Sequence, residues 1–141
     1  MISKKTKYAL HALTYLAEHA TAEMPVAIHV IASETHVSFK FLDTILRDLK
    51  HAGITASKMG KEGGYYLLKQ PAEIHLAEIV RLLDGPIALL PCVSHRYYEP
   101  CKECPDEEAC KIRNSFLDLR AKTVQLMKDV TIADWVKDKN E

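Results

Sequence analysis

Apolar residues recur every three or four positions along most of the chain, and this period predicts a largely helical protein. The first such segment covers residues 4–20, and Ser3 is the expected N-terminal cap of this helix. Two shorter segments, 27–34 and 38–52, follow it and are separated by a tight turn around His36. Short helices joined by a tight turn are the arrangement of a helix-turn-helix, so we expect one here.

The second helix of this pair carries a continuous apolar ridge. Ser38 is a good N-terminal cap for it, and Gly53 is a typical residue for its end. The side chains expected in the core are Phe39, Leu42, Ile45, Leu46 and Leu49. The opposite face of this helix is polar and stays available for contacts with another molecule.

A β-hairpin is predicted directly after this helix. Residues 54–59 and 65–68 have β character, and the glycine-containing segment 60–64 separates them. A winged helix has its wing at this position. The expected fold class is therefore mainly α with a small β-hairpin wing, namely a winged helix-turn-helix followed by a long C-terminal dimerisation helix.

That long helix is predicted over residues 106–130, after a short helix at 76–84 that Gly85 and Pro86 end. Its apolar stripe consists of Ile112, Phe116, Leu119, Thr123 and Met127, widened by Leu126 and Val130. A chain of 141 residues has little else to cover such a stripe. We therefore expect a homodimer that forms through this helix.

The pattern divides the chain into three functional segments. Residues 1–85 form the predicted DNA-binding domain, 86–110 a cysteine loop, and 111–141 the dimerisation helix and C-terminal tail. The N-terminus has lysines but no long apolar run behind them, so we expect neither a signal peptide nor a membrane span. The expected location is the cytoplasm, where thiols are kept reduced.

Charge adds a modest argument for nucleic acid. The 19 basic and 19 acidic residues cancel, but residues 1–70 carry a net charge of +3 and residues 71–141 one of −3. A DNA-binding protein of zero net charge must gather its basic groups on one face. The candidate DNA-binding residues on the second helix and the wing are Ser38, Lys40, Asp43, Thr44, Arg47, Lys58 and Lys61. The alternative for the helix is an ordinary solvated face, and for the wing glycines an ordinary turn.

All four cysteines lie between residues 92 and 110, at Cys92, Cys101, Cys104 and Cys110. Clustered cysteines in a cytosolic chain indicate metal or redox chemistry, since thiolates bind iron–sulfur clusters and zinc. Spacing alone leaves three hypotheses open: an iron–sulfur cluster, a zinc site, and a disulfide switch between Cys101 and Cys104. A small dithiol redox enzyme is a further alternative. We expect no enzyme, because nucleotide-binding and hydrolase motifs are missing.

A resemblance narrows these alternatives. The run from Leu42 to Pro86, with its Gly-Gly-Tyr wing and Leu-Asp-Gly-Pro turn, resembles the Rrf2 family of winged-helix transcription regulators of the IscR- and NsrR-like kind. The opening Lys-Tyr-Ala-Leu-His-Ala-Leu and the cysteine loop before a long helix match the same family in order. The resemblance covers nearly the whole chain.

The resemblance implies a homodimeric repressor that binds a palindromic DNA operator and senses iron–sulfur or redox status. It implies that Asp43 contacts a base, and that Lys58 and Lys61 replace a wing arginine that many members carry where this chain has Met59. It also implies that a [2Fe–2S] or [4Fe–4S] cluster is held by Cys92, Cys104 and Cys110. Cys101 would be a fourth ligand or a resolving thiol, and His11 of the partner subunit is an alternative fourth ligand.

Overall fold

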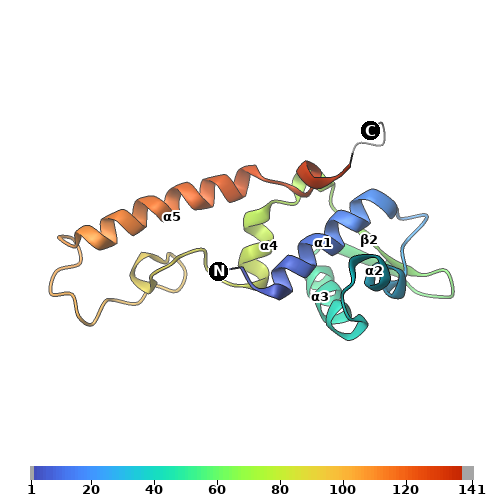
Figure 1. Ribbon diagram of the computed structural model, residues 1–141, viewed down its shortest axis with the longest axis horizontal. Helices are drawn as coiled ribbons and strands as arrows, with labels where there is room; N and C mark the ends of the chain where they lie inside the picture. Colours follow the sequence, from blue (N-terminus) through green and yellow to red (C-terminus); the bar gives the residue numbers. More distant parts are fainter. Residues whose placement is uncertain (1, 138–141) are drawn as a thin grey trace.

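The computed structural model describes residues 2–137, and Figure 1 shows two parts, a helical body and a long arm. The elements in chain order are α1 (Lys4–His19), α2 (Ile28–Thr35), α3 (Phe39–His51), β1 (Thr55–Lys58), β2 (Gly64–Leu67), η1 (Pro71–Glu73), α4 (Leu76–Leu83), η2 (Pro91–Val93), α5 (Lys111–Asp129) and η3 (Ile132–Trp135). The last four residues of the predicted segment 111–141 lie outside the described residues. The predicted fold class, mainly helical with a small hairpin wing, is confirmed.

The core of the body lies between α1, α2 and α3. The hydroxyl of Ser3 accepts a hydrogen bond from the backbone N–H of Thr6 and caps α1, as the sequence predicts. The fully buried core side chains include Leu13, Leu16, Ile31, Leu42, Ile45, Leu46, Leu49, Ile54, Ile74, Ile79 and Ile132. They come from α1, α2, α3, α4, η3 and the segments between them, so this core fixes the orientation of α3.

The predicted tight turn between α2 and α3 is present, and His36 in it has a left-handed backbone. His36 ends α2 with φ 57°, a conformation that histidine tolerates better than most residues. At the other end of α3, Gly53 has φ 76°, and the N–H of Ile54 bonds the carbonyl of Leu49. This is a Schellman end, which stops the helix and directs the chain into β1.

One core prediction for α3 is wrong. Phe39 is 56% exposed, whereas the other four residues of the expected ridge are fully buried. The reason is its position in the first turn, where the helix has only begun and no neighbouring element covers the side chain. Phe39 therefore belongs to the surface that α3 presents at its N-terminus.

The hairpin is pinned by two glycines that approach other backbone closely. β1 and β2 pair antiparallel, with Thr55 opposite Leu67. A Cβ on Gly64 would lie 2.3 Å from the backbone of Val26, and one on Gly63 would lie 2.2 Å from the carbonyl of Lys58. Gly64 therefore lets the wing pack on the body, and Gly63 lets the wing close its own turn, so both have a structural role within the chain.

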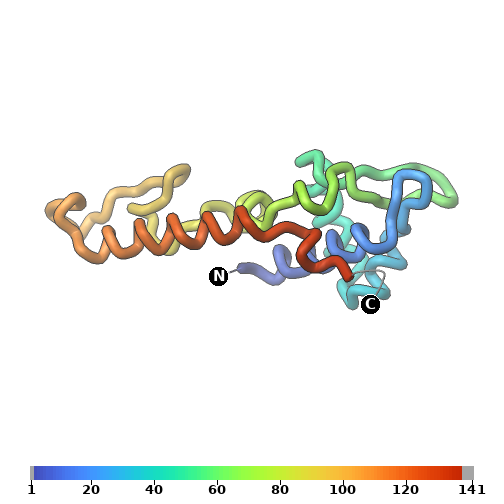
Figure 2. Tube along the Cα trace, turned by 90° about the horizontal axis from the view of Figure 1, so that it is seen from above, coloured from blue at the N-terminus to red at the C-terminus, as the bar shows by residue number. Residues whose placement is uncertain are grey.

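The C-terminal end returns from the arm to the body. The N–H of Leu76 bonds the carbonyl of Val130, and the N–H of Ile132 bonds the carbonyl of Ile74. Thr131 caps η3, and η3 packs against α1. Helix α5 is thus attached to the winged-helix body at its C-terminal end, and Figure 2 shows its other end extending to the cysteine loop.

Helix α5 begins at Lys111, five residues later than predicted, with Cys110 as its cap. The acidic segment before it forms a local turn instead, because the carboxylate of Asp106 accepts the N–H groups of Glu108 and Ala109. Among residues 2–137, no helix has the length and apolar character that a membrane span needs.

Candidate DNA-binding surface and cysteine loop

The N-terminal half of α3 presents polar side chains to solvent. Ser38, Lys40, Thr44 and Arg47 are exposed, and Asp43 is half-buried. The guanidinium of Arg47 lies 2.9 Å from the carboxylate of Asp43, one helical turn away. This pair orients both side chains on the outward face, where a winged helix reads the major groove.

Two of the hydroxyl groups already have partners within the helix. The Ser38 oxygen accepts from the N–H of Phe41, which leaves its proton free to donate to a phosphate. The Thr44 hydroxyl donates to the carbonyl of Lys40 at 3.3 Å, so it can offer DNA an acceptor but not a free proton. Ser38 is the better phosphate donor of the two.

Sequence reasoning missed an aromatic contribution to this surface. Phe39 and Phe41 are both exposed in the first turn of α3, and Phe41 packs edge-on against Tyr8 with ring centroids 5.6 Å apart. Exposed apolar rings at the start of a reading helix can contact thymine methyl groups. The signal was present in the sequence as aromatic residues directly beside the Ser38 cap.

A tyrosine of the wing also lies close to the reading helix. The pKa of Tyr65 is raised, first by burial and then by the negative charge of Asp43, while the positive charge of Arg47 opposes the shift. The Nζ of Lys50 donates to the hydroxyl of Ser57 at 2.7 Å and ties α3 to β1. The wing is therefore held against α3 by polar as well as apolar contacts.

The tip of the wing is open to solvent. Lys58 and Lys61 are exposed on either side of Met59, which is 96% exposed, and of Gly60. Gly60 has φ 109° and nothing within 4 Å of the position of a Cβ. This glycine serves the turn, and the two lysines can reach DNA beside the groove that α3 enters.

Within the cysteine loop, the thiols of Cys104 and Cys110 lie close enough for each to shift the pKa of the other, and the Cys104 thiol donates to the carbonyl of Asp106 at 3.4 Å. The Cys110 sulfur also accepts from the N–H of Arg113 at 3.4 Å, in the first turn of α5. This backbone contact, helped by the neighbouring Cys104 thiol, lowers the pKa of Cys110. Burial, followed by the same thiol pair, raises the pKa of Cys104. Of these two thiols, Cys110 is thus the one more inclined to be a thiolate.

The other two cysteines are connected to this pair through neighbouring residues. The carbonyl of Cys92, in η2, accepts from Nε of Arg113 at 3.3 Å. The N–H of exposed Cys101 donates to the Glu107 carboxylate at 3.2 Å, and the hydroxyl of Tyr98 donates to the same carboxylate. All four cysteines have free thiols.

The structure brings two of the predicted metal ligands together but does not assemble a full set. Among residues 2–137, no three His, Cys, Asp or Glu side chains converge as a metal site would need. The thiol donors nevertheless suit a soft metal or an iron–sulfur cluster, because two lie together and one favours the thiolate. His11 is on α1 beside Trp135, and Figure 1 shows α1 in the helical body, whereas the cysteine loop lies in the arm.

The fold and the exposed reading helix define a winged-helix transcription regulator. The profile of the Rrf2 family, described as an iron-dependent transcriptional regulator, matches residues 2–138. The chain belongs to the Rrf2 family, and the resemblance drawn from the sequence is confirmed. The family consists of transcription regulators that bind DNA, so the expectation that this chain is not an enzyme is also confirmed.

Individual relatives agree with this assignment. An rrf2-like HTH-type transcriptional regulator of Rhodobacter capsulatus is 44% identical over 95% of this chain and 91% of its own length. The HTH-type transcriptional regulator IscR of Vibrio atlanticus is 23% identical over 97% of this chain and 75% of its own. The solved structure of CymR, the global cysteine regulator of B. subtilis, superposes with a TM-score of 0.78 at 26% identity and covers 98% of both chains.

Proposed function

We propose that this regulator is a homodimeric, cytoplasmic repressor of a palindromic operator, and that an iron–sulfur cluster in its cysteine loop controls DNA binding. The segments proposed from the sequence keep their roles: 1–85 bind DNA, 86–110 sense, and 111–141 dimerise. The observation that carries the proposal is the thiol pair of Cys104 and Cys110 at the start of α5, in a family described as iron-dependent.

Support for the dimer comes from the exposed face of α5. Ile112, Leu119 and Leu126 are 67%, 45% and 67% exposed and stand seven residues apart. That spacing places them on one stripe of the helix, which one chain alone leaves in water. A second α5 of the same kind would cover the stripe and give an isologous interface.

Support for operator reading comes from the arrangement of charges on α3 and the wing. Asp43 would face the bases and can accept from a cytosine amino group, while Arg47 would contact a phosphate. Ser38 and Lys40 would position the helix along the phosphates, with Lys58 and Lys61 contacting the backbone beside it. Thr44 would offer its hydroxyl oxygen as an acceptor on the same face. A dimer places two such helices in successive major grooves, which accounts for a palindrome.

The residues that would hold the cluster are Cys92, Cys104 and Cys110, with Cys101 or the partner subunit's His11 as the fourth ligand. When bound, a cluster supplies a redox-sensitive connection between the loop and the start of α5. The chain's own contribution is Arg113, which contacts Cys92 and Cys110 and so holds these two segments in one orientation. Because α5 packs on α4, a shift there would reach the DNA-binding body.

A second candidate is a regulator that uses the thiols without a cluster, by zinc binding or by disulfide formation. The adjacency of Cys104 and Cys110 favours it, since neighbouring free thiols can be oxidised to a disulfide. The pair that would react is then Cys104 with Cys110, in contrast to the Cys101–Cys104 pair that spacing indicated.

Anaerobic purification followed by iron, sulfide and zinc analysis tests the proposal. The cluster hypothesis predicts iron and acid-labile sulfide in equal amounts and a brown protein with visible absorption. A colourless protein that contains zinc, or that contains no metal and cycles between dithiol and disulfide, would support the second candidate instead.

A further inference from the structure

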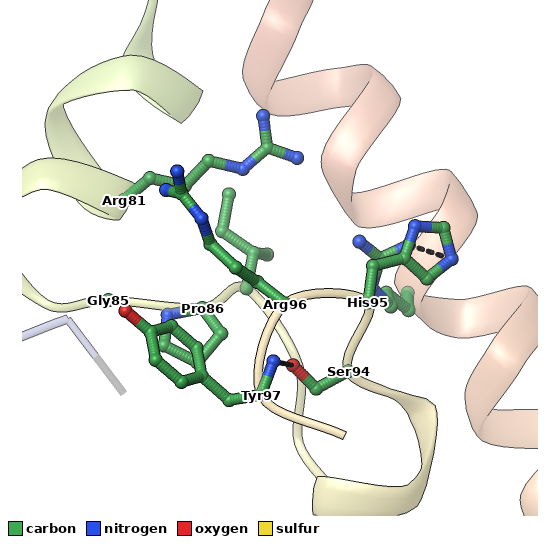
Figure 3. A pocket seen from close by; sticks show the side chains of 9 residues that line it. Arg81, Gly85, Pro86, Ser94, His95, Arg96 and Tyr97 are labelled. Carbon is green, nitrogen blue, oxygen red and sulfur yellow. Dashed lines mark hydrogen bonds between the residues drawn. The ribbon is translucent and has the colours of Figure 1, made fainter.

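A cavity of about 410 Å³ opens between the end of α4, the loop after η2 and the middle of α5. Its charged and polar walls come from segments far apart in sequence: Arg81 on α4, His95 and Arg96 in the loop, and Arg120 on α5. Figure 3 shows Arg81 and Arg96 reaching into the same space, with His95 on the side of α5. The volume lies in the range of small-molecule sites.

The three arginines of this cavity have no acidic partner. None of the residues that line it is acidic, and no salt bridge among residues 2–137 involves any of the three. The other two arginines of the chain both have an acceptor, Arg47 in Asp43 and Arg113 in the Cys92 carbonyl. The cavity therefore collects positive charge that the protein itself does not neutralise.

One of these guanidinium groups carries a buried donor without a partner. The Nε of Arg120 is enclosed and is the one buried side-chain polar atom in the described part of the chain that lacks a hydrogen bond. Its Nη1 lies 3.3 Å from a ring nitrogen of His95, which supplies no negative charge to the guanidinium. Leaving a charged donor buried and unpaired is unfavourable, and an anion in the cavity would satisfy it.

We propose that this cavity binds a small organic anion, a carboxylate or a phosphate ester, whose charged group is held by Arg81, Arg96 and Arg120. Guanidinium groups recognise carboxylate and phosphate oxygens in the same forked geometry, so both belong to one ligand chemistry. Pro86, Ile87 and Tyr97 form the remaining wall and suit an apolar body on the ligand. No cysteine lines the cavity, so the proposal does not depend on the cluster.

A bound anion would connect three parts of the fold at once. Arg81 lies in the last turn of α4, Arg120 in the middle of α5, and Arg96 in the segment that leads to the cysteines. Occupancy would hold the loop against both helices. The cavity is thus placed to stabilise one arrangement of the arm and the DNA-binding body.

Calorimetric titration of the full chain with phenyl phosphate and with benzoate, at constant ionic strength, tests this inference. At least one anion is expected to bind saturably with a Kd below about 1 mM, while uncharged phenol does not bind. Arg120→Gln and Arg96→Gln should each weaken binding about tenfold. Lys122→Gln removes the same charge from the same helix outside the cavity and should bind as the wild type does. The stronger of the two anions identifies the charged group.

Several results would overturn the proposal. One is that neither anion saturates the wild-type protein; another is that the arginine variants bind as well as Lys122→Gln. If Arg120→Gln fails to fold, exposed Arg96 gives the same comparison. Loss of DNA affinity in Arg96→Gln without any anion binding would assign these arginines to the DNA backbone, and the small-molecule site would be wrong.

Discussion

The side chain of Arg113 joins the first turn of α5 to Cys92, since its Nε lies 3.3 Å from the Cys92 carbonyl oxygen. The backbone N–H of the same residue donates to the sulfur of Cys110. One residue thus contacts two of the three proposed cluster ligands, although they are 18 positions apart in sequence. Arg113 thus already links the segments of Cys92 and Cys110. The Cys92 thiol itself does not yet lie beside those of Cys104 and Cys110.

Replacing Arg113 should weaken the hold on the cluster without abolishing it. In Arg113→Ala the Cys92 segment loses its link to α5. Residues that orient metal ligands typically contribute a factor of about 10 to 100 to metal affinity, so we expect the affinity for the cluster to fall by about that factor. The iron that the protein retains after gel filtration in the presence of a competing chelator measures this affinity. Lys111→Ala, an exposed change in the same turn, is the control; equal iron retention in both variants would contradict this role.

The reading helix should show two distinguishable phenotypes. Arg47→Ala should weaken binding to all sequences and reduce the salt dependence of log K by about one unit of slope. Asp43→Ala should instead relax the preference at one base position by about 1–3 kcal/mol, although it also releases Arg47 from its 2.9 Å ion pair. Fluorescence anisotropy on an operator series and a salt series separates the two effects.

Lys122→Ala on α5 is the control for the change in net charge. It should leave both the operator affinity and the salt slope as they are in the wild type. If Arg47→Ala and Asp43→Ala matched this control, α3 would not be the reading helix.

The exposed stripe of α5 should carry the dimer. Leu119→Asp places a charge in the centre of the stripe, and dimer dissociation should increase at least about a hundredfold because that charge would be buried without a partner. Sedimentation at micromolar concentration measures the mass. Asn114→Asp adds the same charge on the opposite side of the helix and should remain dimeric. A wild-type protein that sediments as a monomer would remove the basis of this prediction.

The contact between Asp84 and the N-terminus of α1 should make the stability of the fold depend on pH in the acidic range. Burial by itself would raise the pKa of Asp84, but hydrogen bonds from Ser3 and Thr6 outweigh burial and lower it. A carboxyl with a lowered pKa stabilises the fold above its unfolded pKa, near 4, and this contribution is lost as pH falls through the folded value. Asp84→Asn should therefore cost at most about 1 kcal/mol at neutral pH, since the site is partly exposed to solvent.

Thermal unfolding of Asp84→Asn beside Asp118→Asn across pH tests this sign. Asp118 is exposed and paired only with Lys122, so its variant should stay close to the wild type throughout. The gap between Asp84→Asn and the wild type should close towards about pH 2. A gap that widened as the pH fell would show that the carboxylate destabilises the fold.

The helices of the body could be predicted from the sequence because the features that specify them lie within a few residues of one another. Helices α1 and α3 are defined by neighbouring residues alone, namely the spacing of their apolar residues, the caps Ser3 and Ser38, and Gly53 at the end of α3. The start of α5 escaped prediction because the side chain of Asp106 competes for backbone N–H groups in a stretch whose composition looks helical. Phe39 escaped because burial at the end of a helix depends on which element covers it.

The functional surfaces also divide into those that the sequence predicts and those that only the packing of the fold creates. The polar face of α3 follows from helical period, so its residues could be selected from the sequence. The arginine cavity could not be foreseen, since Arg81, Arg96 and Arg120 are brought together only by the packing of α4, the loop and α5. The thiol pair of Cys104 and Cys110 depends on the same missed turn before α5.

Reconstitution of the single variants Cys92→Ser, Cys104→Ser, Cys110→Ser and Cys101→Ser, with iron and sulfide content and operator affinity measured on each, tests the central claim most directly. The first three should fail to assemble a full cluster and should share one altered operator affinity, while Cys101→Ser keeps at least part of the cluster. If the first three assembled full clusters, or if cluster loss left operator affinity unchanged, the cysteine loop would not be the iron–sulfur switch proposed for this regulator.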